Sequence, residues 1–188
     1  MIRKPLMLLL AAVFLLSAVP ALGDWDEGQP HKMHWPQLPD PYGWDVNATK
    51  PLIIAEDFQC AETGFIKDIH FWGSWKDGIE GNILGFQISF HGDIPDPDGD
   101  GPEYSKPGPT IYDFYVPFAD VVVRPYYDAG DQGWYDPLTG EVELNDHVDY
   151  FQYNIFLAEE DWTYMEQVEG NIYWINISAE VEAGTGVW

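Results

Sequence analysis

Residues 83–91 read Ile-Leu-Gly-Phe-Gln-Ile-Ser-Phe-His, and this stretch indicates the fold class. Large apolar side chains alternate there with small or polar ones, and the apolar positions are Leu84, Phe86, Ile88 and Phe90. Successive side chains of a β-strand point to opposite faces, so a period of two residues is typical of a strand with one buried face. We therefore expect a half-buried strand here.

The same alternation returns in residues 149–157 and 172–181. Other segments are rich in β-branched and aromatic residues, as strands commonly are: 52–58, 65–75, 111–116 and 121–126. Turn signals separate them, and only residues 159–168 carry a weak helical pattern, which a loop would explain equally well. About seven strands without βαβ spacing predict an all-β fold, an antiparallel two-sheet β-sandwich or jelly-roll-like single domain.

The N-terminus has the features of a secretory signal peptide. Arg3 and Lys4 precede an apolar run over residues 6–16, and small residues follow at Ala21 and Gly23. An uncleaved membrane anchor is the alternative, but the run is shorter than the roughly 18 residues that usually span a bilayer. We expect a signal peptide at residues 1–23 and secretion to the extracellular space or the cell surface, with no membrane span in the mature chain.

The rest of the chain divides into a lead-in and one domain. Residues 24–44 are irregular and rich in proline, and residues 45–188 carry the strand patterns. The chain stops at Trp188 directly after a predicted strand, whereas natural termini more often fray into solvent. We therefore interpret the β-sandwich domain as one that is truncated at its C-terminus.

Charge and cysteine content exclude several classes of protein. There are 32 Asp and Glu against 8 Lys and Arg, for a net charge of −24. Binding to nucleic acid or to an anionic membrane needs clustered basic residues, so neither is an expected partner. A single cysteine, Cys60, cannot form an internal disulfide and is best interpreted as a small buried residue.

Several phrases carry a resemblance to a known family: 45–49 (DVNAT), 55–58 (AEDF), 68–75 (DIHFWGSW), 91–95 (HGDIP), 104–108 (YSKPG), 133–140 (GWYDPLTG), 145–147 (NDH), 152–154 (QYN) and 173–174 (YW). In this order and spacing, residues 35–188 resemble an uncharacterised family of secreted bacterial proteins. That family is a domain of unknown function often found upstream of short C-terminal sorting anchors. The resemblance implies secretion and an all-β fold, and it implies that the chain continues past Trp188. It supplies no catalytic residue.

An acidic loop is a candidate calcium site. Alternating aspartates followed by a glycine resemble the first half of a calcium-binding loop. Residue 107, where the usual bidentate glutamate would stand, is a proline. A site in a β-sandwich could instead use Asp93, Asp96, Asp98, Asp100 and Glu103. The alternative is a solvated acidic loop between strands.

Motifs for catalysis are missing from the sequence. The five histidines show no spacing for zinc, and no nucleophile motif surrounds Cys60. Asp146 and His147 are adjacent, but neighbours in an extended chain point to opposite faces, so we do not expect them to act as an acid/base pair. Glu141 and Glu143 share one strand face, as do Glu180 and Glu182, which more often marks a solvated face.

Aromatic residues make up 16% of the chain, and some of them are candidates for ligand binding. Trp72 is opposite in phase to its aromatic neighbours, and Trp134 and Tyr135 fall in a predicted turn with Asp136 beside them. Exposed aromatic rings beside carboxylates and amides suit sugar binding, because the ring stacks on the sugar while polar groups bind its hydroxyls. The alternative is that these rings pack loops onto the sandwich.

The sequence thus favours a secreted or cell-surface module that is not an enzyme and has no required cofactor. Carbohydrate or another surface polymer is the expected ligand, bound by loops of a β-sandwich. Two other roles stay open, a secreted glycan hydrolase that uses an Asp/Glu pair and a purely structural spacer domain. The sequence does not predict an oligomeric state.

Overall fold

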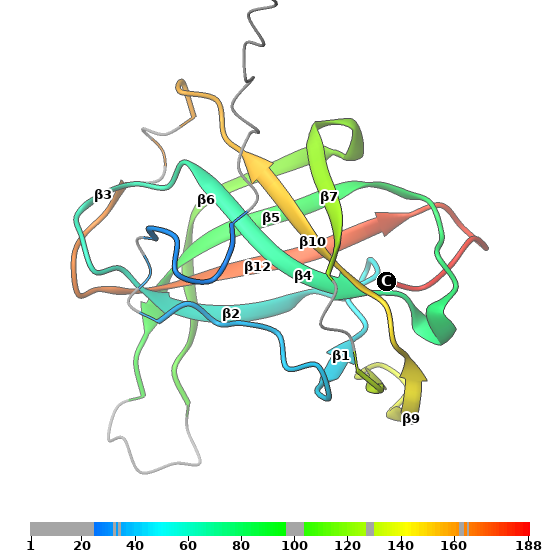
Figure 1. Cartoon of the computed structure of the whole chain (residues 1–188). Helices are drawn as coiled ribbons and strands as arrows, with labels where there is room; N and C mark the ends of the chain where they lie inside the picture. The colour runs from blue at the N-terminus through cyan, green and yellow to red at the C-terminus, as the bar shows by residue number, and fades with distance from the viewer. Residues whose placement is uncertain are drawn as a thin grey trace, which may run out of the picture.

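The computed structural model describes residues 25–31, 33, 35–96, 104–126, 130–161, 164 and 166–188 (Figure 1). The predicted signal peptide lies outside the described residues. The described part is built of β-strands with two short 3₁₀ turns, η1 (Lys76–Gly78) and η2 (Phe118–Asp120). The all-β prediction is confirmed.

Two antiparallel sheets face each other and form a β-sandwich, as predicted (Figure 1). The four-stranded sheet has the order β2 (Ile54–Gln59), β12 (Ile172–Val181), β5 (Ile83–Ile94) and β6 (Lys106–Pro117). The three-stranded sheet has the order β4 (Asp68–Ser74), β10 (Tyr150–Phe156) and β7 (Val121–Tyr126). Strands β2 and β4 are therefore both edge strands.

The alternating residues of the sequence meet between the two sheets. Phe86, Ile88 and Phe90 of β5 pack in one core with Tyr153 and Ile155 of β10. The prediction that Leu84 points into the core is wrong, because Leu84 is 44% exposed and Ile83 is buried instead. A register shift between β5 and β12 at this point reverses the side of the sheet on which the side chains lie.

A third, smaller sheet contains two strands that we did not expect, and a third strand that begins at the predicted strand face of Glu141 and Glu143. It has the order β1 (Trp44–Val46), β8 (Gln132–Asp136) and β9 (Glu141–His147), and β1 runs parallel to β8. Trp134 and Tyr135 therefore lie in a strand and not in a turn, and the turn comes after them, at 137–140. A two-stranded ribbon joins β3 (Gly64–Phe65) to β11 (Glu166–Gln167).

The start of the described chain covers the outer face of the three-stranded sheet. The carbonyl of Trp25 accepts hydrogen bonds from Gln152 at 2.8 Å and from Arg124 at 2.9 Å. Arg124 also pairs with Asp26 at 2.6 Å. These contacts satisfy Gln152, which is fully buried in the middle strand β10, and fix this part of the lead-in on the domain.

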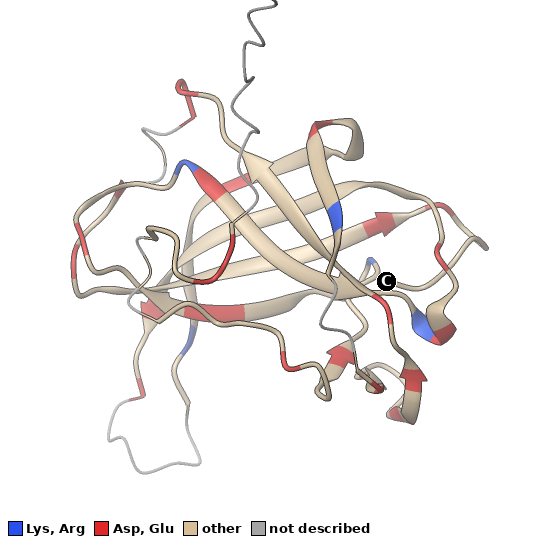
Figure 2. Ribbon diagram, in the orientation of Figure 1, with Lys and Arg blue, Asp and Glu red and all other residues tan. Residues whose placement is uncertain are grey.

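Acidic residues are spread over the whole molecule, whereas basic residues are few. Figure 2 shows acidic residues on loops and strands all over the molecule, with basic residues isolated among them.

The described residues contain no helix long and apolar enough to cross a membrane. Cys60 is buried, as expected, and its thiol donates to Oε1 of Gln167 at 2.5 Å.

Candidate functional site

A cleft with a volume of about 410 Å³ lies between the edge strands β2 and β4, beside β1 and β8. Ligand pockets commonly fall between about 300 and 1,000 Å³. Its rim is exposed at Trp44, Val46 and Glu56, whereas Gly73, Ser74, Trp134, Ile177 and Trp188 are buried at its base. The two sheet edges and the small sheet together make a cleft that no single strand could form.

Four tryptophans line this cleft: Trp44, Trp72, Trp134 and Trp188. Trp44 is 48% exposed and therefore presents part of its ring to solvent. Its ring lies against Gly133 of the neighbouring strand, where an added Cβ would come within 2.6 Å of it. The glycine is thus what allows Trp44 to lie close to β8.

Asp45 also lines the cleft, and two side chains from other strands hold its carboxylate. Oδ2 of Asp45 accepts a short hydrogen bond from the hydroxyl of Ser74 on β4 and lies 2.8 Å from Nε2 of His147 on β9. The Asp45 side chain remains 27% exposed. The carboxylate is therefore fixed in orientation and still open to a ligand.

His147 is the buried link of this network. Its side chain is 0% exposed, and Nδ1 lies 2.8 Å from Oδ2 of Asp146. Burial lowers the pKa of His147, but its hydrogen bonds to Asp45 and Asp146 raise that pKa by more, so the net shift is upward. The raised pKa favours the imidazolium form, in which both ring nitrogens donate, one to each carboxylate.

The contact between Asp146 and His147 contradicts our expectation for this dipeptide. We expected neighbours in an extended strand to point apart, yet their side chains are hydrogen-bonded. The backbone is irregular at this point, since Asn145, directly before the pair, has a φ of 54°. Asparagine tolerates this left-handed conformation better than most residues.

The network does not form a serine nucleophile. In a Ser-His-Asp catalytic triad the serine hydroxyl contacts the histidine. Here the hydroxyl of Ser74 donates to Asp45 instead. What the arrangement offers is a carboxylate acceptor held in one orientation, in a cleft whose lining includes four tryptophans.

Two of the four predicted ligand-binding residues line the cleft, and two do not. Trp72 is half-buried and makes edge-to-face contacts with Trp25 and Tyr126, and Trp134 is only 1% exposed. Our expectation that Trp134 is an exposed ring is therefore wrong, because Gln132, Gly133 and Trp134 of β8 are all buried.

Tyr135 and Asp136 lie on β8 outside the set of cleft residues. Tyr135 is 38% exposed. Oδ1 of Asp136 accepts from the backbone N–H groups of Leu138 and Thr139, at 2.8 and 3.3 Å, and Oδ2 accepts from Asn47 at 3.1 Å. Burial raises the pKa of Asp136, but these hydrogen bonds lower it by more, so the net shift is downward. Asp136 therefore stabilises the turn that follows β8.

The predicted calcium loop lies mostly outside the described residues. This holds for Asp98, Asp100 and Glu103. Asp93 belongs to β5, and its Oδ1 accepts a hydrogen bond from the indole of Trp174 at 2.8 Å. Asp96 follows the end of β5. Calcium binding by this loop stays a prediction.

Sequence reasoning missed Trp44, Asp45, Ser74 and His147 as parts of one site. Asp45 and His147 are 102 positions apart, and no motif connects them. The local sequence offers no signal either, because His147 stands in the polar stretch Asn-Asp-His-Val-Asp at 145–149.

By its fold and its site, this protein is a β-sandwich with an aromatic cleft and a carboxylate held in one orientation. The chain belongs to the family described as Domain of unknown function (DUF7901), whose model matches residues 33–188. This agrees with the resemblance to an uncharacterised family found in the sequence. No curated protein and no solved structure matches the chain.

Proposed function

We propose that this chain is a secreted, non-catalytic module that binds carbohydrate in the cleft between β2 and β4. The observation that carries the proposal is that one cleft is lined both by the half-exposed Trp44 and by Asp45, whose carboxylate Ser74 and His147 hold in place. Secretion is proposed from the signal-peptide pattern of residues 1–23.

The chemistry of the cleft fits a sugar better than a wholly apolar ligand. A pyranose has an apolar face that stacks on an aromatic ring, and it has hydroxyl groups that need hydrogen-bond partners. Trp44 supplies a ring, and Asp45 supplies an acceptor already oriented by Ser74 and His147. Because that carboxylate is held before binding, little conformational entropy is lost when a hydroxyl group engages it.

The experiment is a binding panel of insoluble polysaccharides with the parent protein and two variants. Trp44→Ala removes the stacking ring, and Asp45→Asn keeps the shape but removes the charge. We expect each variant to lose at least about tenfold in affinity, which corresponds to about 1.4 kcal/mol. The matched control is Trp35→Ala, since Trp35 is 75% exposed and does not line the cleft.

Three results would contradict the proposal. Failure of the parent protein to bind any polysaccharide leaves the spacer role. Equal losses in the Trp35 variant and the Trp44 variant would indicate nonspecific adsorption through exposed aromatic rings. Full binding by the Asp45 variant would separate sugar binding from this cleft. Each variant is first checked for a native unfolding transition.

A glycan hydrolase is the second candidate, because Asp45 and Glu56 line the same cleft from different strands. Glycosidases use two carboxyl groups on either side of the scissile bond. The test is product formation from a soluble oligosaccharide that the parent protein binds. Release of reducing ends that disappears in Glu56→Gln, with binding retained, would favour the hydrolase over the binding module.

A further inference from the structure

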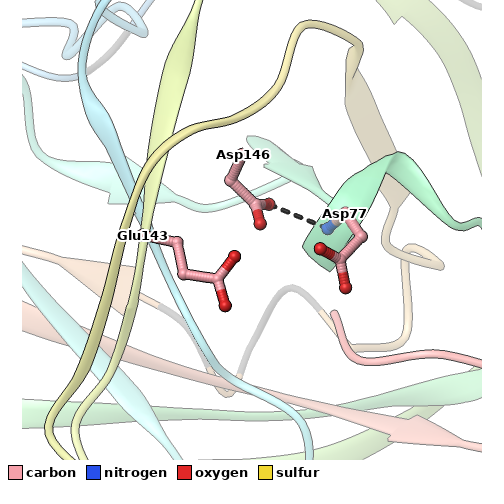
Figure 3. A group of neighbouring side chains, drawn as sticks. All are labelled: Asp77, Glu143 and Asp146. Carbon is pink, nitrogen blue, oxygen red and sulfur yellow. Dashed lines mark hydrogen bonds between the residues drawn. The ribbon is translucent and has the colours of Figure 1, made fainter.

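Three carboxyl groups converge at the contact between η1 and β9, on Asp77, Glu143 and Asp146 (Figure 3). We call them the acidic cluster. One oxygen from each lies within 4.8 Å of the others. Asp77 is exposed, and Glu143 and Asp146 are partly buried as whole residues, so water can reach the cluster from the Asp77 side.

Asp146 gives the acidic cluster a feature that a chance group of surface carboxylates lacks. Its side chain is 0% exposed, and its Oδ2 accepts hydrogen bonds from His147 and from the backbone N–H of Asp77. Its Oδ1 is buried and has no hydrogen-bond partner. Figure 3 shows this second oxygen turned toward the carboxyl groups of Asp77 and Glu143. A buried carboxylate oxygen without a donor calls for a positive ligand.

Lys76, the basic residue beside the acidic cluster, compensates only part of its negative charge. Lys76 lies 2.7 Å from Glu141 and 3.4 Å from Glu143, so its ammonium group is shared between two carboxylates. The neighbouring Glu141 carboxyl raises the pKa of Glu143, as expected where carboxylates crowd together. The lysine lies on the Glu143 side and makes no ion pair with Asp146 or Asp77.

We infer that the acidic cluster binds a calcium ion, with Asp77, Glu143 and Asp146 as the protein ligands and water completing the shell. Calcium takes six to eight oxygen ligands in flexible geometry, which suits three carboxylates from a turn and a strand. Magnesium demands a regular octahedron and keeps its own water, so it fits this open site less well. The site differs from the acidic loop predicted from the sequence and does not depend on carbohydrate binding in the cleft.

The experiment is calcium titration of chelator-treated protein by calorimetry, with melting temperature as a second readout. We expect one calcium ion per chain at this site, with a Kd of about 10⁻⁴ to 10⁻³ M, as in extracellular modules. Calcium at about 10 mM should raise the melting temperature by roughly 3–10 °C, because the ion binds only the native state. Magnesium at the same concentration should raise it less.

The variants are chosen to leave the buried His147 network intact. Glu143→Gln and Asp77→Asn each remove one ligand charge, and asparagine is tolerated at the left-handed φ of 58° found at Asp77. Each should weaken calcium binding at least about tenfold and abolish most of the rise in melting temperature. Glu141→Gln is the matched control: it lies on the same strand and contacts the same lysine, but it is not part of the acidic cluster.

Other outcomes would overturn the assignment. If calcium produces no heat and no shift in melting temperature in the parent protein, the acidic cluster binds no calcium and Lys76 alone offsets its negative charge. Unchanged calcium binding in both the Glu143 and Asp77 variants places the ion elsewhere. The triple change of Asp96, Asp98 and Asp100 to Asn tests the loop, and loss of all calcium binding in that variant alone would move the site there. Calcium binding without sugar binding leaves this inference standing.

Discussion

His147 holds Asp45 across the small sheet, with Nε2 of the imidazole 2.8 Å from Oδ2 of the carboxylate. The two residues belong to β9 and β1, which are separated by β8 in the sheet order. The side-chain contact therefore joins the two outer strands of that sheet. It also explains how a carboxylate in the cleft keeps one orientation.

Replacing His147 should destabilise the fold severely. His147→Ala leaves the carboxylates of Asp45 and Asp146 without their shared partner, and the side chain of Asp146 is fully buried. Removing one partner of a buried charge pair typically costs about 3–5 kcal/mol in the free energy of unfolding. Urea denaturation measures this loss, with the exposed His31→Ala as control. A loss below about 1 kcal/mol would show that the network contributes little.

Trp134 should behave as a core residue. Its side chain is 1% exposed, so Trp134→Ala should lower the free energy of unfolding by about 3–5 kcal/mol. Tyr135→Ala is the matched control on the same strand, because Tyr135 is 38% exposed and should cost far less. Chemical denaturation of both variants gives the comparison. Similar losses in the two variants would contradict the difference in burial.

Gly133 should be needed for the position of the Trp44 ring. In Gly133→Ala the new Cβ would fall 2.6 Å from that ring, so Trp44 must move. We expect a loss of about 1–3 kcal/mol and a change in tryptophan fluorescence. Gly92→Ala in β5 is the control, because its Cβ would meet no atom within 4 Å. Native-like fluorescence and stability in the Gly133 variant would show that the contact is not tight.

His70 should make stability depend on pH. Burial lowers its pKa, but hydrogen bonds to Asp68 and Asn154 raise it by more, so the native pKa lies above 6.5. A raised native pKa means that this stabilisation is complete below the unfolded pKa and is lost as pH rises through the native value.

The measurement is the free energy of unfolding of the parent and of His70→Gln between pH 5 and 8. The advantage of the parent should be largest at the acid end and should shrink toward pH 8. His147 is present in both proteins, so its own contribution cancels in the difference. A difference that grows with pH would contradict the assigned direction.

The long strands could be predicted from the sequence because each has one face in the main core. β5, β10 and β12 lie inside the two large sheets, so their apolar residues keep a period of two over most of their length. Leu84 fails only because the register shifts beside it. Local backbone irregularity of this kind leaves no trace in an alternation pattern.

The small sheet could not be predicted in the same way. Three successive residues of β8, Gln132, Gly133 and Trp134, are buried, so no alternation marks this strand. β1 has only three residues and pairs with β8 in parallel from far away in the chain. The cleft depends on this pairing, so only Trp72 and Trp134 were predicted among its residues, and Asp45 was missed.

The small sheet has a kinetic consequence for the cleft. β9 is exposed at most of its positions, whereas β5 and β12 are largely covered by the main core. Amide protons in weakly buried units exchange with solvent through local opening, without global unfolding. We therefore expect slow exchange on the β12 side of the cleft and faster exchange at β1, which is exposed at two of its three residues. A bound ligand should slow deuterium uptake in residues 44–46 while leaving that of β12 nearly unchanged.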